Sequence, residues 1–223
     1  MRLLDLFCGA GGAAMGYHRA GFEDITGIDN RPMPRYPFNF IQADALGYLA
    51  EHGQEYDVIH ASPPCQHYSV TKYLHNNQYP DLIEPLRKML KETGKTYVIE
   101  NVIGAPLLDP ITLCGISFGL MVRRHRLFET KFFILQPPDR CKNEKYYVIF
   151  GHEVRARRHG AKAGEKQKIS VGRMAMGIDW MTRGELSQAI PPAYTEYVGK
   201  WILDPINRLA KEFEPLVINK ANS

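Results

Sequence analysis

Cys65 is the side chain in this sequence best placed to act as a nucleophile. A hydrophobic run, residues 56–61, reads as a short buried strand, and Ser62, Pro63 and Pro64 follow it. The two prolines fix φ twice and forbid a helix, so the strand leaves through a stiff exit that can hold Cys65 over a pocket. A thiolate is a strong nucleophile, which points to covalent catalysis. By itself, a free cysteine is more often a small buried hydrophobe, and only the rest of the chain favours the nucleophile.

Three charged side chains could assist such a nucleophile. Glu100 ends a second buried strand, predicted over residues 96–99. A hydrophobic setting would raise its pKa and let it donate a proton or hydrogen bond, while a solvated cap or ion-pair partner is the simpler alternative. Arg124 and Arg126 lie in a basic segment, 123–126. Such a segment suits either phosphate and base contacts or a solvated surface.

The N-terminal segment has the order of a nucleotide-binding α/β unit. An apolar run at 3–7 predicts a strand, residues 8–12 form a glycine-rich turn, and residues 13–20 predict a helix that ends at Gly21. Glycines in such a turn let the backbone approach a ligand closely. A tight turn without any ligand remains the alternative, because a short glycine pattern has low specificity.

Acidic residues mark the ends of three successive predicted strands, at Asp5, Asp29 and Asp44. Ligands of open α/β sheets bind at the carboxyl ends of the strands, so these carboxylates are placed to meet a nucleotide. Asp29 follows the glycine turn by about twenty residues, which is the position typical of a ribose ligand.

The composition limits the possible domain organisation, location and metal content of the protein. The chain has 223 residues, of which 44% are hydrophobic and 23% charged, as expected for one globular domain with at most a small appendage. No apolar run approaches the length of a membrane span and no signal-peptide pattern begins the chain, so we expect a cytoplasmic protein without a membrane partner. Four cysteines without a CxxC pair favour free thiols and predict no metal site.

The formal net charge of +4 comes mainly from one region, residues 131–175. This local surplus of lysine and arginine favours a small appendage that contacts nucleic acid over a flexible, solvated insertion. A second long polar segment, 66–80, follows Cys65, and its length predicts a functional loop that closes over substrate.

These segments, in this order, resemble the cytosine-C5 DNA methyltransferase family. The matching segments are Asp5-Leu6-Phe7-Cys8-Gly9-Ala10-Gly11-Gly12, Pro63-Pro64-Cys65-Gln66, Glu100-Asn101-Val102, Arg124-x-Arg126 and Ala189-Ile190-Pro191-Pro192. The resemblance covers the chain except for residues 131–175, and the pairing of PPCQ with ENV is its most specific part.

The resemblance implies an α/β fold of the S-adenosylmethionine-dependent methyltransferase type, with a mostly parallel seven-stranded sheet and flanking helices. It places a catalytic domain at residues 1–130 and 176–223, and a small basic target-recognition segment at 131–175. It also implies that a C-terminal helix, residues 195–210, packs beside the first helix, residues 13–20.

The activity implied is methyl transfer to C5 of a flipped-out cytosine in double-stranded DNA, as in restriction-modification enzymes of bacteria or phages. Cys65 would attack C6, Glu100 would bind the ring at N3 and the amino group, and Arg124 and Arg126 would bind the base and nearby backbone. The short chain favours a monomer from a bacterial or phage-infected cell.

The cofactor implied is S-adenosyl-L-methionine. The residues carried over to its site are Asp5, Phe7, Gly9, Ala10, Gly11, Gly12, Asp29, Asn30, Asp44 and Pro63. Within this set, Phe7 would line the adenine or methionine pocket, Asp29 would bind ribose, and Asp44 would accept from the adenine amino group.

The sequence departs from the family at two motifs. Val122 stands where a glutamine usually opens the arginine motif, and Ser187-Gln188 stands where Gly-Asn usually opens the C-terminal motif. Three other functions stay open: an adenine or cytosine amino-methyltransferase, which would not need Cys65, an RNA cytosine-C5 methyltransferase on the same fold, and a catalytically silent DNA-binding relative.

Overall fold

The computed structural model describes residues 1–65, 68, 81–138, 140–141, 145–151, 153–158 and 164–205. Most of the loop expected to close over substrate, including Gln66, lies outside these residues. The part of the expected C-terminal helix beyond residue 205 does so as well.

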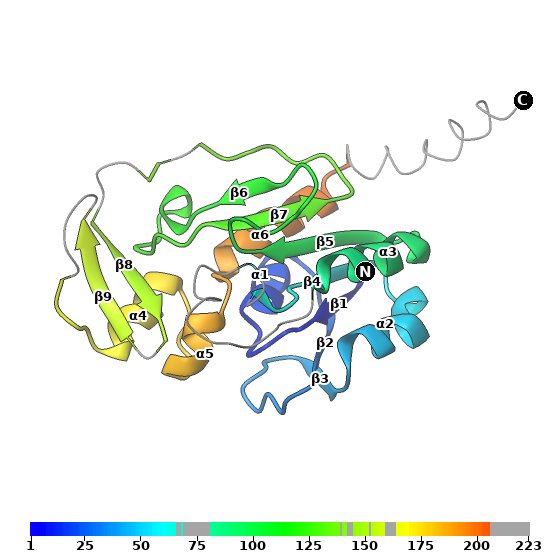
Figure 1. The fold of residues 1–223 in the computed structure, drawn as a ribbon, viewed down its shortest axis with the longest axis horizontal. Coiled ribbons are helices and arrows are strands. Elements are labelled where there is room, and N and C mark those ends of the chain that lie inside the picture. The colour runs from blue at the N-terminus through cyan, green and yellow to red at the C-terminus, as the bar shows by residue number, and fades with distance from the viewer. Residues whose placement is uncertain are drawn as a thin grey trace, which may run out of the picture.

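A seven-stranded sheet forms the centre of the molecule (Figure 1). β7 runs in the direction opposite to that of all the other strands, which are parallel to one another. The predicted α/β fold with a mostly parallel seven-stranded sheet is therefore confirmed. The strands in spatial order are β3 (Asn39–Gln42), β2 (Asp24–Asp29), β1 (Arg2–Leu6), β4 (Val58–Ala61), β5 (Thr96–Asn101), β7 (Arg126–Thr130) and β6 (Ile111–Leu113).

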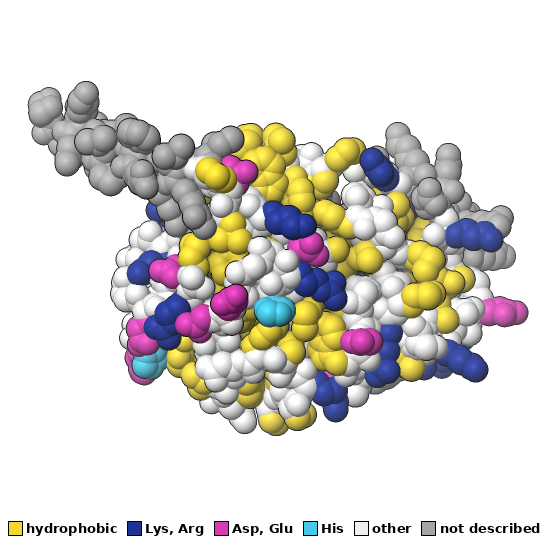
Figure 2. All heavy atoms as spheres, turned by 180° about the vertical axis from the view of Figure 1, so that it is seen from behind, with side chains coloured by type: hydrophobic (Ala, Val, Ile, Leu, Met, Phe, Trp, Pro, Cys, Tyr) yellow, Lys and Arg dark blue, Asp and Glu magenta, His cyan; other side chains and the backbone are white. Residues whose placement is uncertain are grey.

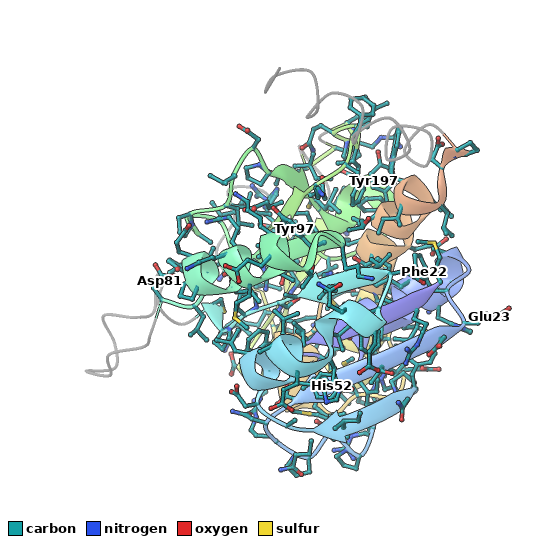
Figure 3. All side chains as sticks on the ribbon, turned by 90° about the vertical axis from the view of Figure 1, so that its right-hand side faces the viewer. Phe22, Glu23, His52, Asp81, Tyr97 and Tyr197 are labelled. Atoms are coloured by element: carbon teal, nitrogen blue, oxygen red, sulfur yellow. The ribbon has the colours of Figure 1, made fainter. Side chains whose placement is uncertain are left out.

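Helices cover both faces of this sheet. The first face carries α1 (Gly12–Ala20) and α6 (Pro192–Leu203), and the second carries α2 (Ala45–His52) and α3 (Ile83–Thr93). Side chains of β1 alternate accordingly, because Leu3 packs with α1 and α6 whereas Leu4 and Leu6 pack with α2 and α3. Figure 3 shows α2 and α3 on the second face, with His52 at the end of α2 and Asp81 just before α3.

The contact between α1 and α6 joins the two ends of the described chain. Thr195 donates from its hydroxyl to the Ala13 carbonyl at 2.7 Å, and Gly16 and Gly199 let the two backbones approach closely. The implied packing of the C-terminal helix beside the first helix is therefore present. The helix begins at Pro192 rather than at residue 195, because proline is well suited to the first helical turn.

A small lobe extends from the sheet between β7 and α6. It contains the antiparallel hairpin of β8 (Lys145–Phe150) and β9 (Glu153–Arg158), followed by α4 (Ile169–Met176) and α5 (Arg183–Gln188). The lobe has its own apolar cluster, which includes Ile149 and Met176. In Figure 2, basic side chains gather at the end of the molecule that carries this lobe, and the opposite end mixes both signs.

The segment between β6 and β7 is not a continuous strand. β6 ends at Leu113, and a short 3-10 helix, η4 (Gly115–Phe118), follows it. Gly119 ends that helix with a φ of 73°, and such a left-handed residue interrupts a strand.

A second 3-10 helix, η1 (Gly53–Glu55), leads from α2 into the loop before β4. No helix within the described ranges combines the length and the apolar character that a membrane span requires.

Replacing Gly16 by alanine tests the contact of α1 with α6. The added Cβ would overlap the Thr195 hydroxyl and the Pro192 carbonyl oxygen. We expect Gly16→Ala to lower the free energy of unfolding by about 1–3 kcal/mol or more in urea titrations. Gly184→Ala in α5 is the matched control, because its Cβ meets nothing within 4 Å. It should leave stability unchanged or raise it by up to about 1 kcal/mol. Equal effects of the two substitutions would contradict the packing argument.

Candidate active site

Cys65 lies beyond the carboxyl end of β4, at the predicted stiff exit. The Ser62 N–H donates to the Leu6 carbonyl at 3.2 Å, which keeps this exit beside β1. The Asn101 amide donates to the Pro63 carbonyl at 2.9 Å, which ties it to the end of β5. Pro63 is buried and Cys65 is half-buried, so the thiol is held in place without being enclosed. The buried amide of Asn101 supports this turn, a role that sequence reasoning did not assign.

Glu100 and Arg126 form an ion pair at the same edge of the sheet, with 3.0 Å between Oε1 and Nε. Glu100 is the penultimate residue of β5 and Arg126 begins β7, and the register of the two antiparallel strands brings these ends together. Glu100 is only 5% exposed. Burial raises the pKa of its carboxyl, although Arg126 and a hydrogen bond with Ser62 act in the opposite direction.

The thiol of Cys65 lies within electrostatic range of this pair. Burial raises its pKa above the ordinary value, and the negative charge of Glu100 adds to that effect. Arg126 lowers the pKa most strongly among the neighbouring charges, and Arg124 lowers it less. The structure therefore brings the predicted nucleophile, acid and one arginine to a single place.

Arg124 is arranged differently from Arg126. Its guanidinium donates to the carbonyls of Ser187 at 2.6 Å and Ile149 at 3.3 Å, so it bonds both α5 and β8 of the small lobe. Burial lowers its pKa to about 9, and the positive charge of Arg126 contributes. Its Nε is buried and has no hydrogen-bond partner within the part of the chain that the structure describes.

A buried row of polar groups lies behind Glu100. The ring of His60 contacts the Tyr17 hydroxyl at 3.0 Å through Nδ1 and the Ser62 hydroxyl at 2.9 Å through Nε2. Burial lowers the pKa of His60 to about 3, so the ring is neutral at physiological pH. Ser62 in turn bonds Glu100. One signal for this row is visible in the sequence, because His60 is the polar residue of the strand Val58–Ala61.

The glycine turn after β1 has the strained backbone of a tight ligand-binding loop. Phe7 has a φ of 59°, an uncommon value for a side chain of this size, and Gly9 has a φ of 50°. Asp29 fixes the turn by accepting from the Gly9 N–H at 3.1 Å through Oδ2. Its other oxygen accepts from the Arg31 N–H at 3.1 Å, so this carboxylate holds the loop in the present structure.

The C-terminal segments close over the other side of the turn. The Trp180 indole donates to the Ala10 carbonyl at 2.8 Å. A Cβ on Gly12 would overlap the Ile190 carbonyl oxygen, and a Cβ on Gly11 would lie 2.5 Å from the Pro37 ring. These two glycines are therefore required by packing. By contrast, a Cβ on Gly9 would meet nothing within 4 Å, which leaves open space beside the loop.

Asp5 carries the feature that best fits a polar ligand. It is 1% exposed, and its Oδ2 accepts from the Tyr36 hydroxyl at 3.2 Å. Oδ1 is buried and has no partner among the described residues. Burial raises the pKa of Asp5 to about 7, the Tyr36 hydrogen bond opposes this, and Asp29 adds to it. The orphaned oxygen of Asp5 and the open space at Gly9 are two features that fit a polar ligand such as S-adenosylmethionine.

Asn30 and Asp44 border the same edge. Asn30 is exposed directly after β2, and its carbonyl accepts from Gln42 at 3.2 Å. Asp44 is exposed and caps α2 by accepting from the Gly47 N–H at 2.8 Å. Asp44 therefore has a structural role in addition to its predicted contact with the cofactor.

Comparison with known proteins agrees with this geometry. Residues 1–106 match the family described as C-5 cytosine-specific DNA methylase. The resemblance found in the sequence is thus confirmed for this part, which is just under half of the chain and holds the glycine turn, Cys65 and Glu100.

Two curated relatives are Type II methyltransferases. M.NgoMIV of Neisseria gonorrhoeae is 33% identical over 116 residues, which cover 48% of this chain and 36% of the relative. M.FnuDI of Fusobacterium nucleatum is 35% identical over 113 residues, which cover 47% of this chain and 33% of the relative. The matched part therefore spans about a third of the length of either relative.

Solved structures share the fold over nearly the whole chain. The Dnmt2 methyltransferase of S. pombe has a TM-score of 0.62 at 12% identity, covering 93% of this chain and 99% of that one. The methyltransferase EhMeth of Entamoeba histolytica has a TM-score of 0.59 at 12% identity, covering 92% and 98%. The methyltransferase fold therefore includes the half beyond residue 106.

The raised pKa of Asp5 predicts a pH dependence of stability. An unfolded aspartate loses its proton near pH 3.8, whereas the folded chain keeps it until about pH 7. The folded state thus binds more protons in this window, and its stability falls as the pH rises from about 4 to 7. The size of the effect is on the order of 4 kcal/mol at most.

Asp5→Asn keeps an acceptor for Tyr36 and removes the titration. Urea unfolding of both proteins at several pH values should show a steeper decline for the wild type, because other groups titrate equally in the two proteins. Parallel pH profiles would contradict the assignment of a protonated Asp5.

Proposed function

We propose that the protein is a DNA (cytosine-5-)-methyltransferase that uses S-adenosyl-L-methionine. The observation that supports this most directly is the convergence of Cys65, Glu100 and Arg126 at the carboxyl edge of a methyltransferase sheet. The family match over residues 1–106 and the names of the Type II relatives point to the same activity. An amino-methyltransferase would have no use for Cys65 at this position.

The cofactor would be held by the glycine turn and the acids at the strand ends. Gly9 offers open space and Asp5 an unpartnered acceptor, while Asp29 and Asp44 border the same edge. When bound, S-adenosylmethionine supplies an electrophilic methyl group.

The chain's own residues would make the target carbon reactive. The Cys65 thiolate adds to C6 of the cytosine, and the new S–C bond makes C5 nucleophilic. Glu100, whose pKa burial raises, donates to N3 and so stabilises the charge that develops on the ring. Arg126 orients Glu100 and favours the thiolate. After methylation, a base takes the proton from C5 and the thiolate leaves C6, which restores the ring.

The substrate proposed is double-stranded DNA, from which the cytosine must be flipped out. The basic side chains at the lobe end of the molecule would contact its phosphates (Figure 2). We further propose target recognition by residues 131–175, restriction-modification as the biological setting, and a cytoplasmic monomer. RNA is the second candidate substrate, because the proposed chemistry at cytosine C5 is the same.

Cys65→Ala tests the nucleophile. We expect the wild type to transfer tritiated methyl groups to plasmid DNA and to form a stable adduct with a duplex that contains 5-fluorocytosine. The variant should do neither, because it has no sulfur to bond C6. Scintillation counting and denaturing gels measure the two outcomes. A duplex without the fluorinated base is the control for the adduct.

A labelled product from the Cys65→Ala variant would contradict the nucleophile and favour an amino-methyltransferase. If neither protein labels DNA, a structured RNA offered in the same assay distinguishes the second candidate from a silent DNA-binding protein.

Glu100→Gln tests the acid. Glutamine keeps the shape and the Ser62 contact but cannot deliver a proton to N3, so we expect kcat to fall by about 10²-fold or more. Binding of S-adenosylmethionine, measured by calorimetry, should stay within a factor of two or so, because Glu100 lies outside the glycine turn. An unchanged kcat would show that Glu100 is only an ion-pair partner.

A further inference from the structure

Three side chains that can bind a metal ion lie close together, apart from Cys65 and the Glu100–Arg126 ion pair. Cys114 follows β6, His125 lies between the two arginines, and Cys141 lies on the chain that enters the small lobe. The Sγ atoms of Cys141 and Cys114 are 2.9 Å apart, and Cys141 Sγ is 3.4 Å from His125 Nε2. All three ligand atoms lie within 4.8 Å of one another.

The setting of this group differs from that of ordinary buried cysteines. Cys114 and Cys141 are 4% and 5% exposed, and neither forms a disulfide bond. Two buried thiols and an imidazole that face one point provide the donor set that zinc prefers. A tetrahedral zinc ion separates its sulfur and nitrogen ligands by roughly 3.4–3.8 Å, so a shift of the two sulfurs by under about 1 Å would seat it.

We propose that Cys114, His125 and Cys141 bind a structural zinc ion. Binding releases the two thiol protons and leaves two thiolates and a neutral imidazole around the metal. Structural zinc takes four ligands, and we assign three of them here. The proposal departs from the expectation of no metal site, which rested on the absence of a CxxC pair.

The position of the site gives it a role. Two further contacts hold the segment before Cys141 along the sheet: the Gln136 side chain bonds the Thr112 backbone at 2.6 and 2.7 Å, and Ser117 donates to the Pro138 carbonyl at 2.9 Å. The metal would complete this attachment where the chain leaves the sheet for the lobe.

His125 connects the proposed zinc site to the Glu100–Arg126 ion pair. Its carbonyl accepts from the Arg126 guanidinium at 2.8 Å, and Arg126 pairs with Glu100. A metal on His125 would therefore fix the backbone that presents Arg126. This positioning role rests on the proposed function, whereas the metal site itself does not.

Metal analysis of the full-length protein tests the site. Protein expressed in medium with added zinc and purified without chelators should contain about one zinc ion per chain by mass spectrometry of the elements. Replacement by cobalt should produce the intense thiolate-to-cobalt absorption that two sulfur ligands give. Cys114→Ser, Cys141→Ser and His125→Gln should each reduce the zinc content to background, whereas Cys65→Ser, a cysteine outside the group, should retain it.

Measurements on the wild-type protein test the zinc site even if the ligand variants do not fold. Purified chain without zinc that gains no thiolate–cobalt absorption on titration would overturn the proposal. A disulfide between Cys114 and Cys141 in metal-free protein, seen by non-reducing peptide mapping, would replace it with a redox pair. Removal of zinc by a strong chelator should lower Tm and slow methyl transfer, and zinc should restore both. A chain that binds zinc but transfers no methyl group would leave the site intact and refute only the proposed function.

Discussion

The close contact between α1 and α6 is the constraint on which the rest of the molecule depends. Thr195 bonds the carbonyl of Ala13, 182 residues earlier in the chain, and Gly16 provides the space for that approach. Because α6 is fixed there, the segment before it reaches the glycine turn, where Ile190 packs on Gly12 and Trp180 bonds Ala10. The turn after β1 is thus shaped by residues from the opposite end of the sequence.

Burial of charged groups determines the chemistry available at the carboxyl edge. Asp5, His60 and Glu100 point to the same face of three neighbouring strands, and each is at most 5% exposed. Burial raises the pKa values of the two acids and lowers that of His60, so each group favours its neutral form. Arg126 is the cation that opposes this trend most strongly at Glu100 and Cys65, and Arg124 adds a smaller effect.

The small lobe shows how the two departures from the family motifs are accommodated. Val122 is buried in the lobe's apolar cluster and pairs with Tyr147, so the arginine segment is supported by the hairpin where the family has a glutamine. Ser187 accepts from Arg124 through its backbone carbonyl, which any residue could supply. Both substitutions therefore leave the arginine segment attached to its neighbours.

The sequence by itself determined the alternation of strands and helices, the strand-end positions of Asp5, Asp29 and Glu100, and the stiff exit before Cys65. These features are local: apolar runs, glycine and proline positions and the order of motifs specify them without knowledge of packing. The parallel sheet follows, because βα units place their carboxyl ends at one edge.

Only the tertiary structure decided which of the two arginines pairs with Glu100, since that depends on the register of β7 against β5. It also revealed the row from Tyr17 through His60 to Ser62, and the group of Cys114, His125 and Cys141. Residues 11 and 16 positions apart in sequence show no ligand spacing, and they meet only because the sheet and the lobe fold three separate segments onto one point.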